Sequence, residues 1–127
     1  MENSEKSLPD VDRDETSSQW KHLPAGRLGS FIEESVYRGT GWALFESNDE
    51  ALWSKIRLSV GKFMHDLYVK GVFRGDSPGE AYYVRCGSDT MTQDDIANGN
   101  LNVEIGFAPV ELEEFVHLRV RHLARQD

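Results

Sequence analysis

The sequence has a single cysteine, Cys86, and no long apolar run. One cysteine cannot form a disulfide within the chain, so the fold does not depend on an oxidising compartment, and we expect assembly in the cytosol. No segment approaches the ~20 apolar residues that a membrane-spanning helix requires, and no positively charged start precedes an apolar stretch. The sequence therefore predicts neither a transmembrane helix nor a secretory signal.

Positive charge is also scarce, since the net charge is -8. Binding of phosphate backbones through counterion release needs a basic surface, so we expect no nucleic-acid partner. An acidic chain is equally unlike a protein held on an anionic membrane by charge, and we expect no membrane partner. Much of the acidity lies in residues 1–19, with six acidic and two basic residues. We interpret residues 1–26 as an acidic N-terminal arm and connector, because Pro24 and Gly26 interrupt regular structure.

Residues with the spacing of a catalytic or metal site are missing. The four histidines lack the i, i+4 spacing of a zinc pair on a helix. Cys86 falls in a predicted strand, and we interpret it as a buried structural thiol. The adjacent pairs Glu33-Glu34 and Asp94-Asp95 diverge on a helix or strand, which favours solvated surface over a shared acid/base site. The sequence predicts no enzyme, no metal and no cofactor.

A long amphipathic helix over residues 50–70 is the clearest element present. Seven apolar residues recur at helical spacing and make one stripe: Leu52, Trp53, Ile56, Val60, Phe63, Met64 and Leu67. Ser47 with Glu50 reads as a capping box, with Asn48 as an alternative N-cap, and Gly71 is a suitable residue to end the helix. Gly61 is unfavourable, because glycine inside a helix costs about 1 kcal/mol relative to alanine.

The remaining pattern predicts a small α+β domain over residues 27–123, followed by a short C-terminal end at 124–127. A shorter helix spans residues 28–38, and residues 42–45 are expected to form a buried strand or extended connector. Residues 81–86 have strand composition, one helical turn is expected at 93–97, and residues 101–107 and 115–120 alternate as half-buried strands. The fold class is a small antiparallel sheet covered by two helices. The strand at 101–107 should be the sheet centre.

Such a sheet has few strands, so its edges display unpaired backbone groups. A protein either blunts these edges or uses them to bind another chain. The last strand alternates Val116, Leu118 and Val120 with His117, Arg119 and Arg121. Charge on an edge strand is more often a guard against aggregation than a partner site. The two interpretations stay open at this point.

Three segments resemble the C-terminal domain of contractile tail sheath proteins, which occur in myophage tails, R-type tailocins and contractile injection systems. They are G-W-x-x-F-E-x-N-D-E-x-L-W at Gly41–Trp53, T-Q-D-D-I-x-N-G at Thr92–Gly99 and E-I-G-x-A-P-V-x-x-x-E-F at Glu104–Phe115. A strand with Y-x-R-C at Tyr83–Cys86 accompanies them. Complete sheath proteins of this type are several times longer, so we expect a stand-alone relative or an excised domain.

The resemblance implies a non-enzymatic structural subunit of a virion tail or contractile particle, assembled in the bacterial cytoplasm. Its partners would be further copies of itself in stacked hexameric rings, an inner tail tube protein, and a baseplate or sheath initiator. Arms of neighbouring subunits would complete the sheet. The alternative is a sheath-like adaptor (an initiator, cap or terminator) that binds the sheath or tube in a single ring.

The resemblance also implies two sets of contact residues. The last strand would exchange with neighbouring subunits through Phe115, Val116, His117, Leu118, Arg119 and Val120. By analogy with the basic helix face of such domains, Lys55 and Lys62 would contact the tube. The two lysines lie seven residues apart and share a helix face away from the apolar stripe. From the residues alone, that face is ordinary solvated surface.

Overall fold

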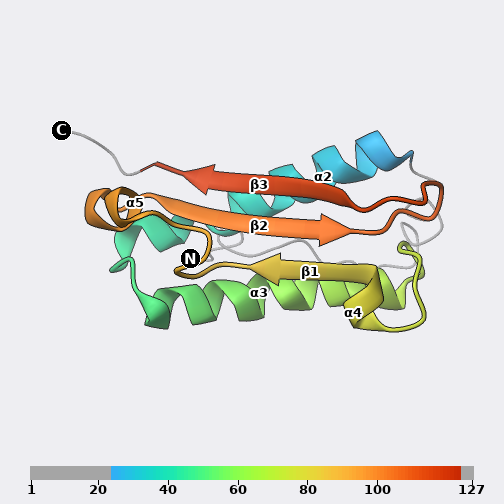
Figure 1. Ribbon diagram of the computed structural model, residues 1–127, viewed down its shortest axis with the longest axis horizontal. Helices are drawn as coiled ribbons and strands as arrows, with labels where there is room; N and C mark the ends of the chain where they lie inside the picture. The colour runs from blue at the N-terminus through green and yellow to red at the C-terminus, as the bar shows by residue number, and fades with distance from the viewer. Residues whose placement is uncertain (1–23, 124–127) are drawn as a thin grey trace, which may run out of the picture.

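The computed structural model describes residues 24–123 (Figure 1). The predicted N-terminal arm, apart from residues 24–26, and the predicted C-terminal end at 124–127 lie outside the described residues. The elements run in the order α2 (Ala25–Gly39), η2 (Gly41–Phe45), α3 (Glu50–Val69), α4 (Pro78–Ala81), β1 (Tyr82–Arg85), α5 (Gln93–Asn98), β2 (Leu101–Phe107) and β3 (Val116–His122).

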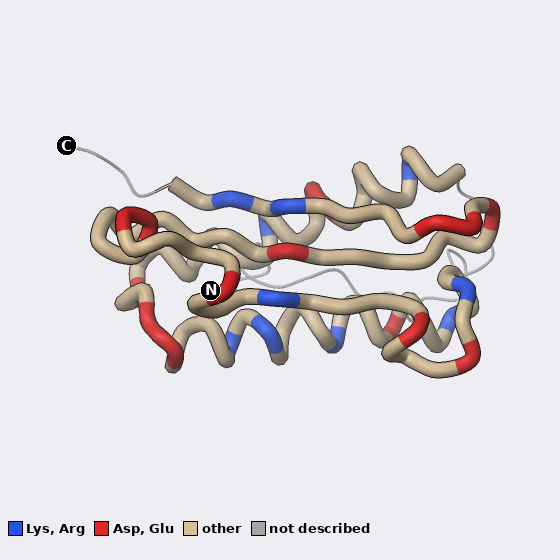
Figure 2. Tube along the Cα trace, viewed as in Figure 1, with Lys and Arg blue, Asp and Glu red and all other residues tan. Residues whose placement is uncertain are grey.

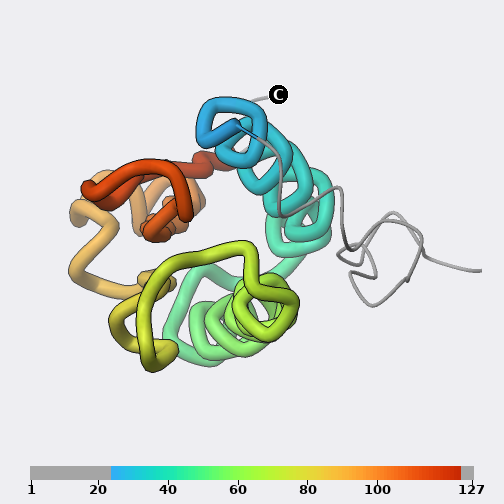
Figure 3. Tube along the Cα trace, turned by 90° about the vertical axis from the view of Figure 1, so that its right-hand side faces the viewer, coloured from blue at the N-terminus to red at the C-terminus, as the bar shows by residue number. Residues whose placement is uncertain are grey.

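The three strands form one antiparallel sheet in the order β1-β2-β3. Four residues of β1 pair with β2, from Tyr82 opposite Phe107 to Arg85 opposite Glu104. Seven residues of β3 pair with β2, from Val116 opposite Phe107 to His122 opposite Leu101. Helices α2 and α3 cover the same face of the sheet, α2 beside β3 and α3 beside β1 (Figure 3). The α+β class and the central position of the 101–107 strand are confirmed.

The core lies between that sheet face and the two helices. All seven apolar residues of the predicted stripe are buried in α3. They meet the buried α2 residues Leu28, Ile32 and Val36 and the inward side chains of β2. Each such aliphatic or aromatic side chain contributes roughly 1.5–3 kcal/mol on burial. The 3.6-residue period of α3 is therefore the feature of the sequence that sets the layer packing.

Helix α3 begins at Glu50, as predicted, but its N-cap is neither Ser47 nor Asn48. Asp49 is the N-cap, and its side chain accepts a hydrogen bond from the Leu52 N–H at 3.3 Å. Ser47 is therefore not the capping residue. Asn48 does not cap the helix either, because its amide Nδ2 donates to Asn100 O (2.7 Å) and its Oδ1 accepts from Trp53 Nε1 (2.7 Å). At the other end, Gly71 has a φ of 81°, as expected for the residue that terminates the helix.

Two predictions on the N-terminal half are wrong. Helix α2 starts at Ala25 and includes Gly26, because Pro24 with its fixed φ serves as the N-cap and does not interrupt the helix. Residues 42–45 belong to the 3₁₀ helix η2 and form neither a buried strand nor an extended connector. Its hydrogen bonds run from Ala43 N to Thr40 O and from Glu46 N to Ala43 O. Phe45 is 85% exposed, whereas Ala43 is buried and Trp42 packs against the core, so the segment is only partly buried.

Strand β2 is buried on both faces, where alternation predicted a half-buried strand. On the outer face Asn102 is 1% exposed, because neighbouring polar side chains cover it. Gly106 lies beneath the ring of Tyr83. No helix among residues 24–123 has the length and apolar character needed to cross a membrane.

Candidate functional site

Strand β3 is an edge of the sheet, and it contains five of the six residues predicted for strand exchange. Val116, Leu118 and Val120 face the helices, whereas His117 and Arg119 face outward. Phe115 precedes the strand. In an antiparallel pair only alternate residues of an edge strand form backbone hydrogen bonds with the neighbouring strand, so the remaining residues point their N–H and C=O groups away from the sheet. The open backbone edge of β3 is therefore seven residues long.

A groove runs along this edge between β3 and α2. One hollow of about 470 Å³ is lined by Ser30, Glu33, Glu34, Tyr37, Arg119, Val120 and Arg121. A second hollow of about 340 Å³ is lined by Ala25, Gly26, Gly29, Ser30, Glu33, Leu112, Val116 and Leu118. Ser30 and Glu33 belong to both, so the two hollows adjoin. The floor of the groove is apolar near the start of β3 and charged near its end.

The opposite edge of the sheet is less accessible. β1 pairs with only four residues of β2. Beyond it, the loop before α5 takes the place of a strand: Thr90 Oγ1 donates to Asn102 O at 3.0 Å, and Asn102 Nδ2 donates to Thr90 O at 2.9 Å. Arg57 Nη1 donates to Cys86 O at 2.6 Å and so occupies the acceptor that follows β1. Among the described strands, β3 has the longest open edge.

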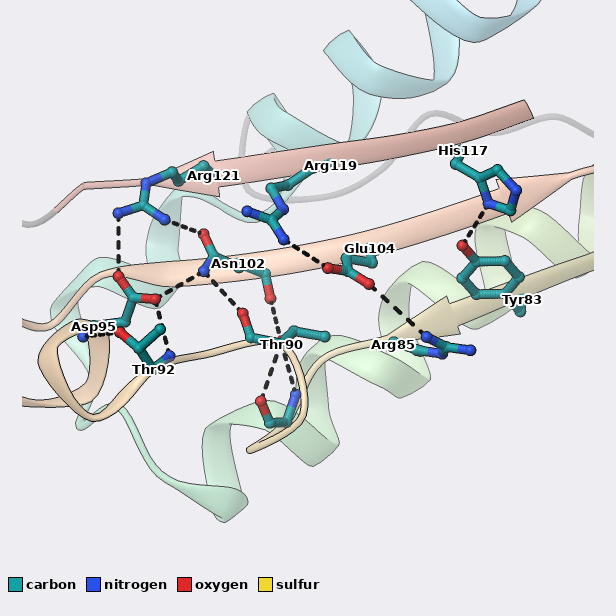
Figure 4. Close-up of polar contacts among 11 residues, drawn as sticks. Tyr83, Arg85, Thr90, Thr92, Asp95, Asn102, Glu104, His117, Arg119 and Arg121 are labelled. Atoms are coloured by element: carbon teal, nitrogen blue, oxygen red, sulfur yellow. Dashed lines mark hydrogen bonds and ion pairs between the residues drawn. The ribbon is translucent and has the colours of Figure 1, made fainter. Parts of the chain in front are cut away.

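The outer sheet face carries two rows of side chains (Figure 4). Tyr83 lies over Gly106 and its hydroxyl is 2.8 Å from His117 Nδ1. In the next row Glu104 accepts from Arg119 at 2.9 Å and lies 4.0 Å from Arg85. Helices α2 and α3 lie on the opposite face of the sheet, and α5 reaches this face only at Asn102. The predicted alternation is confirmed, with His117, Arg119 and Arg121 on the face opposite Val116, Leu118 and Val120.

Asp95 is the centre of a polar network at the end of the sheet (Figure 4). It caps α5 with Thr92 and accepts from Asn102 Nδ2 (3.2 Å) and Arg121 Nη2 (3.1 Å). Hydrogen bonding from the Thr92 N–H is the main cause that lowers the pKa of the Asp95 carboxyl, and Arg121 adds to it. Asp95 is 7% exposed, so its interpretation as solvated surface is wrong. The adjacent Asp94 is exposed, as expected.

His122 ends β3 on the inner face. It is 3% exposed, lies 2.9 Å from Thr40 Oγ1 through Nε2, and stacks on Tyr37 with ring centroids 4.5 Å apart. Burial lowers the pKa of its imidazole. Since Thr40 Oγ1 donates to Val36 O, the imidazole Nε2 is the donor to Thr40. His122 thus attaches the end of the edge strand to the end of α2.

The predicted tube contacts lie on a different surface, the outer side of α3. Lys55 and Lys62 have side chains 59% and 76% exposed. Lys55 pairs with Glu46 at 3.1 Å, and Lys62 pairs with Asp66 at 2.9 Å. Figure 2 shows several basic residues along α3. The structure therefore separates the two predicted contact sets, with β3 at one edge and the lysines on the far helix face.

Cys86 lies in the core, as expected for a structural thiol. It is 1% exposed, and burial raises its pKa to about 12. Its charged neighbour in space is Arg57 of α3, which sequence adjacency could not reveal. Within residues 24–123, no group of three or more His, Cys, Asp or Glu side chains is placed to hold a metal ion.

Comparison with known proteins gives two informative structures. A chain in the cryo-EM structure of the anti-feeding prophage (AFP) baseplate superposes with a TM-score of 0.66 at 30% identity, over 95% of this chain and 32% of that one. A chain of the contracted PVC sheath complex, from an extracellular contractile injection system, superposes with a TM-score of 0.63 at 32% identity. This superposition covers 72% of this chain and 26% of that one.

The chain thus spans about a third or less of these neighbours. No protein-family profile matches it, and no curated protein does so either. The similarity in sequence and fold confirms the predicted relationship to contractile-tail proteins: the chain is related to structural components of contractile injection systems.

Proposed function

We propose that the chain is a structural subunit of a contractile tail sheath, which polymerises around an inner tube by strand exchange between neighbouring subunits. The observation that carries this proposal is the open seven-residue edge of β3 with a groove beside it. An incoming strand can pair with β3 through backbone hydrogen bonds and place alternate side chains in the groove. The resemblance to the C-terminal domain of sheath proteins supports it.

The proposal gives each surface a partner. The β3 edge and its groove bind an arm of another copy, within hexameric rings that stack into a sheath. Phe115 and the strand residues through Val120 are the exchange residues. The outer face of α3, with Lys55 and Lys62, contacts the inner tube protein, and a baseplate or sheath initiator starts the polymer. Assembly takes place in the bacterial cytoplasm, and the role requires no enzyme activity, nucleic acid or membrane.

Filling the groove tests the proposal. Ser30 is exposed on α2 and lines both hollows, so Ser30→Trp should occupy the groove without disturbing the core. Arg27→Trp is the matched control, because Arg27 is exposed on the same helix and lines neither hollow. Electron microscopy and sedimentation should show polymers for the wild type and for Arg27→Trp, but only unassembled protein for Ser30→Trp.

Normal polymers from a folded Ser30→Trp variant would contradict strand exchange at this edge. Deleting β3 is a poorer test, because the strand carries the buried residues Val120 and His122. Their loss would expose the core, and failure to assemble would then have two explanations. Circular dichroism of each variant establishes that the helices are intact.

A second candidate is an accessory adaptor that binds the sheath or tube in a single ring, as an initiator, cap or terminator. The observation that favours it is the similarity to a chain of the AFP baseplate structure, whose superposition covers 95% of this chain. Stoichiometry separates the two roles. A sheath subunit is present in many copies along the particle, whereas an adaptor contributes about one ring, so quantitative mass spectrometry of purified particles decides between them.

A further inference from the structure

The last residue of the edge strand is buried, unlike the basic residues that precede it. His122 is 3% exposed, whereas the side chains of Arg119 and Arg121 are 56% and 40% exposed. Helix α2 and strand β3 end on the same side of the domain, where His122 meets Thr40 and the ring of Tyr37 (Figure 1). Histidine is the one side chain whose ordinary charge change falls between about pH 5 and 8. The end of β3 is therefore closed by a buried group that can become charged near neutral pH.

The surroundings of His122 suit the neutral imidazole. Thr40 is 0% exposed, and its hydroxyl already donates to Val36 O at 2.6 Å, so it can only accept from the imidazole. The neutral tautomer with its proton on Nε2 satisfies this contact. Among residues 24–123, no group forms a hydrogen bond with Nδ1, the atom that a second proton would occupy. A charged ring is therefore costly at this position.

The charges around His122 lie elsewhere in α2, β2 and β3, and η2 has no charged residue. The titratable side chains in the second half of α2 and on the strands beside His122 are Glu33, Glu34, Tyr37, Arg38, Glu104, Arg119 and Arg121. The two helix carboxylates line the groove, where Glu34 pairs with Arg38. The three charged strand residues lie on the outer face of the sheet, and His122 lies on the inner face. Within this set, Tyr37 is the group in contact with the imidazole.

Burial decides the charge of the His122 ring. The stacked Tyr37 ring favours a cation weakly, but burial prevails and lowers the pKa of the imidazole from its ordinary 6.5. A released or unfolded strand end takes up a proton near pH 6.5, and the buried ring does not. The stability that neutral His122 contributes is thus fully present above pH 6.5 and is lost as pH falls below that value.

Tyr37 connects this joint to the groove. Its ring stacks on His122 and also lines the hollow of about 470 Å³ beside Val120 and Arg121. When His122 turns toward water, Tyr37 loses its stacking partner and the end of β3 loses its attachment to Thr40. The groove then loses part of its wall, and an incoming strand has a shorter ordered edge to pair with.

We propose that His122 is a pH-sensitive latch for the groove between β3 and α2. The neutral imidazole fastens the end of the edge strand to Thr40 and holds Tyr37 in the groove wall. The protonated imidazole turns toward water in mildly acidic solution, frees the strand end and weakens the binding of an incoming strand. This regulation rests on the proposed function and deepens it, because it sets the pH range in which subunits exchange strands.

The first test uses the unassembled protein. An NMR titration of the wild type should show the His122 imidazole titrating below pH 6.5, with amide shifts at the ends of β3 and α2 over the same range. The folding equilibrium constant, from urea unfolding, should fall by up to about 10-fold between pH 7.5 and 5.5, because unfolding takes up a proton at this site.

Two glutamine variants assign this pH dependence. His122→Gln stays neutral and keeps an N–H donor for Thr40, so it should lose most of the difference between the two pH values. His65→Gln is the matched control, because His65 is an exposed histidine of α3, remote from the groove in sequence and structure. This variant should keep the wild-type pH dependence.

Sedimentation of assembled protein at pH 7.5 and 5.5 tests the regulation. The wild type and His65→Gln should assemble less at pH 5.5, whereas His122→Gln should assemble equally at both pH values. The Asp95 network does not interfere, because the pKa of that carboxyl is lowered from 3.8 and the group stays ionised throughout this range.

Three results separate the possible failures. Titration of His122 at or above pH 6.5, or unchanged pH dependence of unfolding in a folded His122→Gln variant, overturns the latch. Equal pH dependence of assembly in the wild type and His122→Gln overturns the regulation of the groove. Absence of wild-type polymers at pH 7.5 rejects the proposed function, and the titration of the wild type then still decides the latch.

Discussion

The ring of Tyr83 lies so close over Gly106 that a Cβ at position 106 would be 2.1 Å from Tyr83 Cε2. Gly106 is therefore required by a cross-strand contact, although its backbone angles are not unusual. The ring, held in this position, also stacks on Phe115 and meets His117. The contact thus ties β1 to the start of the edge strand.

Replacing Gly106 with alanine should displace Tyr83 and destabilise the domain by roughly 1–3 kcal/mol, as overpacking does. Urea unfolding gives the free energy. The double variant Gly106→Ala/Tyr83→Ala should be less than additive, because the clash requires both side chains. Strict additivity in this cycle would mean that the ring and the glycine act independently.

Asn48 links the start of α3 to the turn before β2. Asn48→Ala should cost about 1–3 kcal/mol in unfolding free energy, because the indole N–H of the mostly buried Trp53 then has no acceptor. Ser47→Ala, the neighbouring exposed position, should stay within about 0.5 kcal/mol of the wild type. If Ser47 proved the more costly of the two, Ser47 and not Asp49 would be the effective cap.

Local periodicity predicted the parts of the fold that depend on near neighbours. The α3 stripe, the helical turn after Thr92 and the alternation of β3 each follow from residues within a few positions of one another. The N-cap of α3 was harder to predict, because Ser47, Asn48 and Asp49 are all good N-cap residues. The choice among them depends on Asn100 and Trp53, because both form hydrogen bonds with the Asn48 side chain.

The groove and the polar network could not be predicted, because both join distant segments. Ser30 and Arg121 line the same hollow from opposite ends of the chain. Asp95 looked like surface beside Asp94, and only the folded sheet brings Arg121 to it. A sequence pattern assigns residues to faces of an element, but it does not say which element covers each face.

The Asp95 network should make stability depend on pH in acid. The folded-state pKa of Asp95 is lowered, chiefly by the Thr92 N–H, so its contribution is present above the ordinary carboxyl value near 3.8 and is lost as pH falls through the lower folded value. The free energy of unfolding measured in urea should therefore change less between pH 7 and pH 3 in Asp95→Asn than in the wild type. Asp94→Asn, outside the network, should keep the wild-type difference; an equal effect of both variants would contradict this account.

The Cys86 thiol should be unreactive in the folded protein. Its pKa, raised by burial to about 12, keeps the thiol neutral, and its stabilising contribution is present below the unfolded thiol value near 9 and is lost as pH rises toward 12. A thiol-specific disulfide reagent at pH 8 should label the native protein far more slowly than protein unfolded in urea, because only the thiolate reacts and Cys86 is 1% exposed. Cys86→Ala should cost about 1 kcal/mol in stability through lost burial, and leave polymerisation unchanged. Rapid native labelling, or loss of assembly in a folded Cys86→Ala variant, would assign this thiol a role beyond packing.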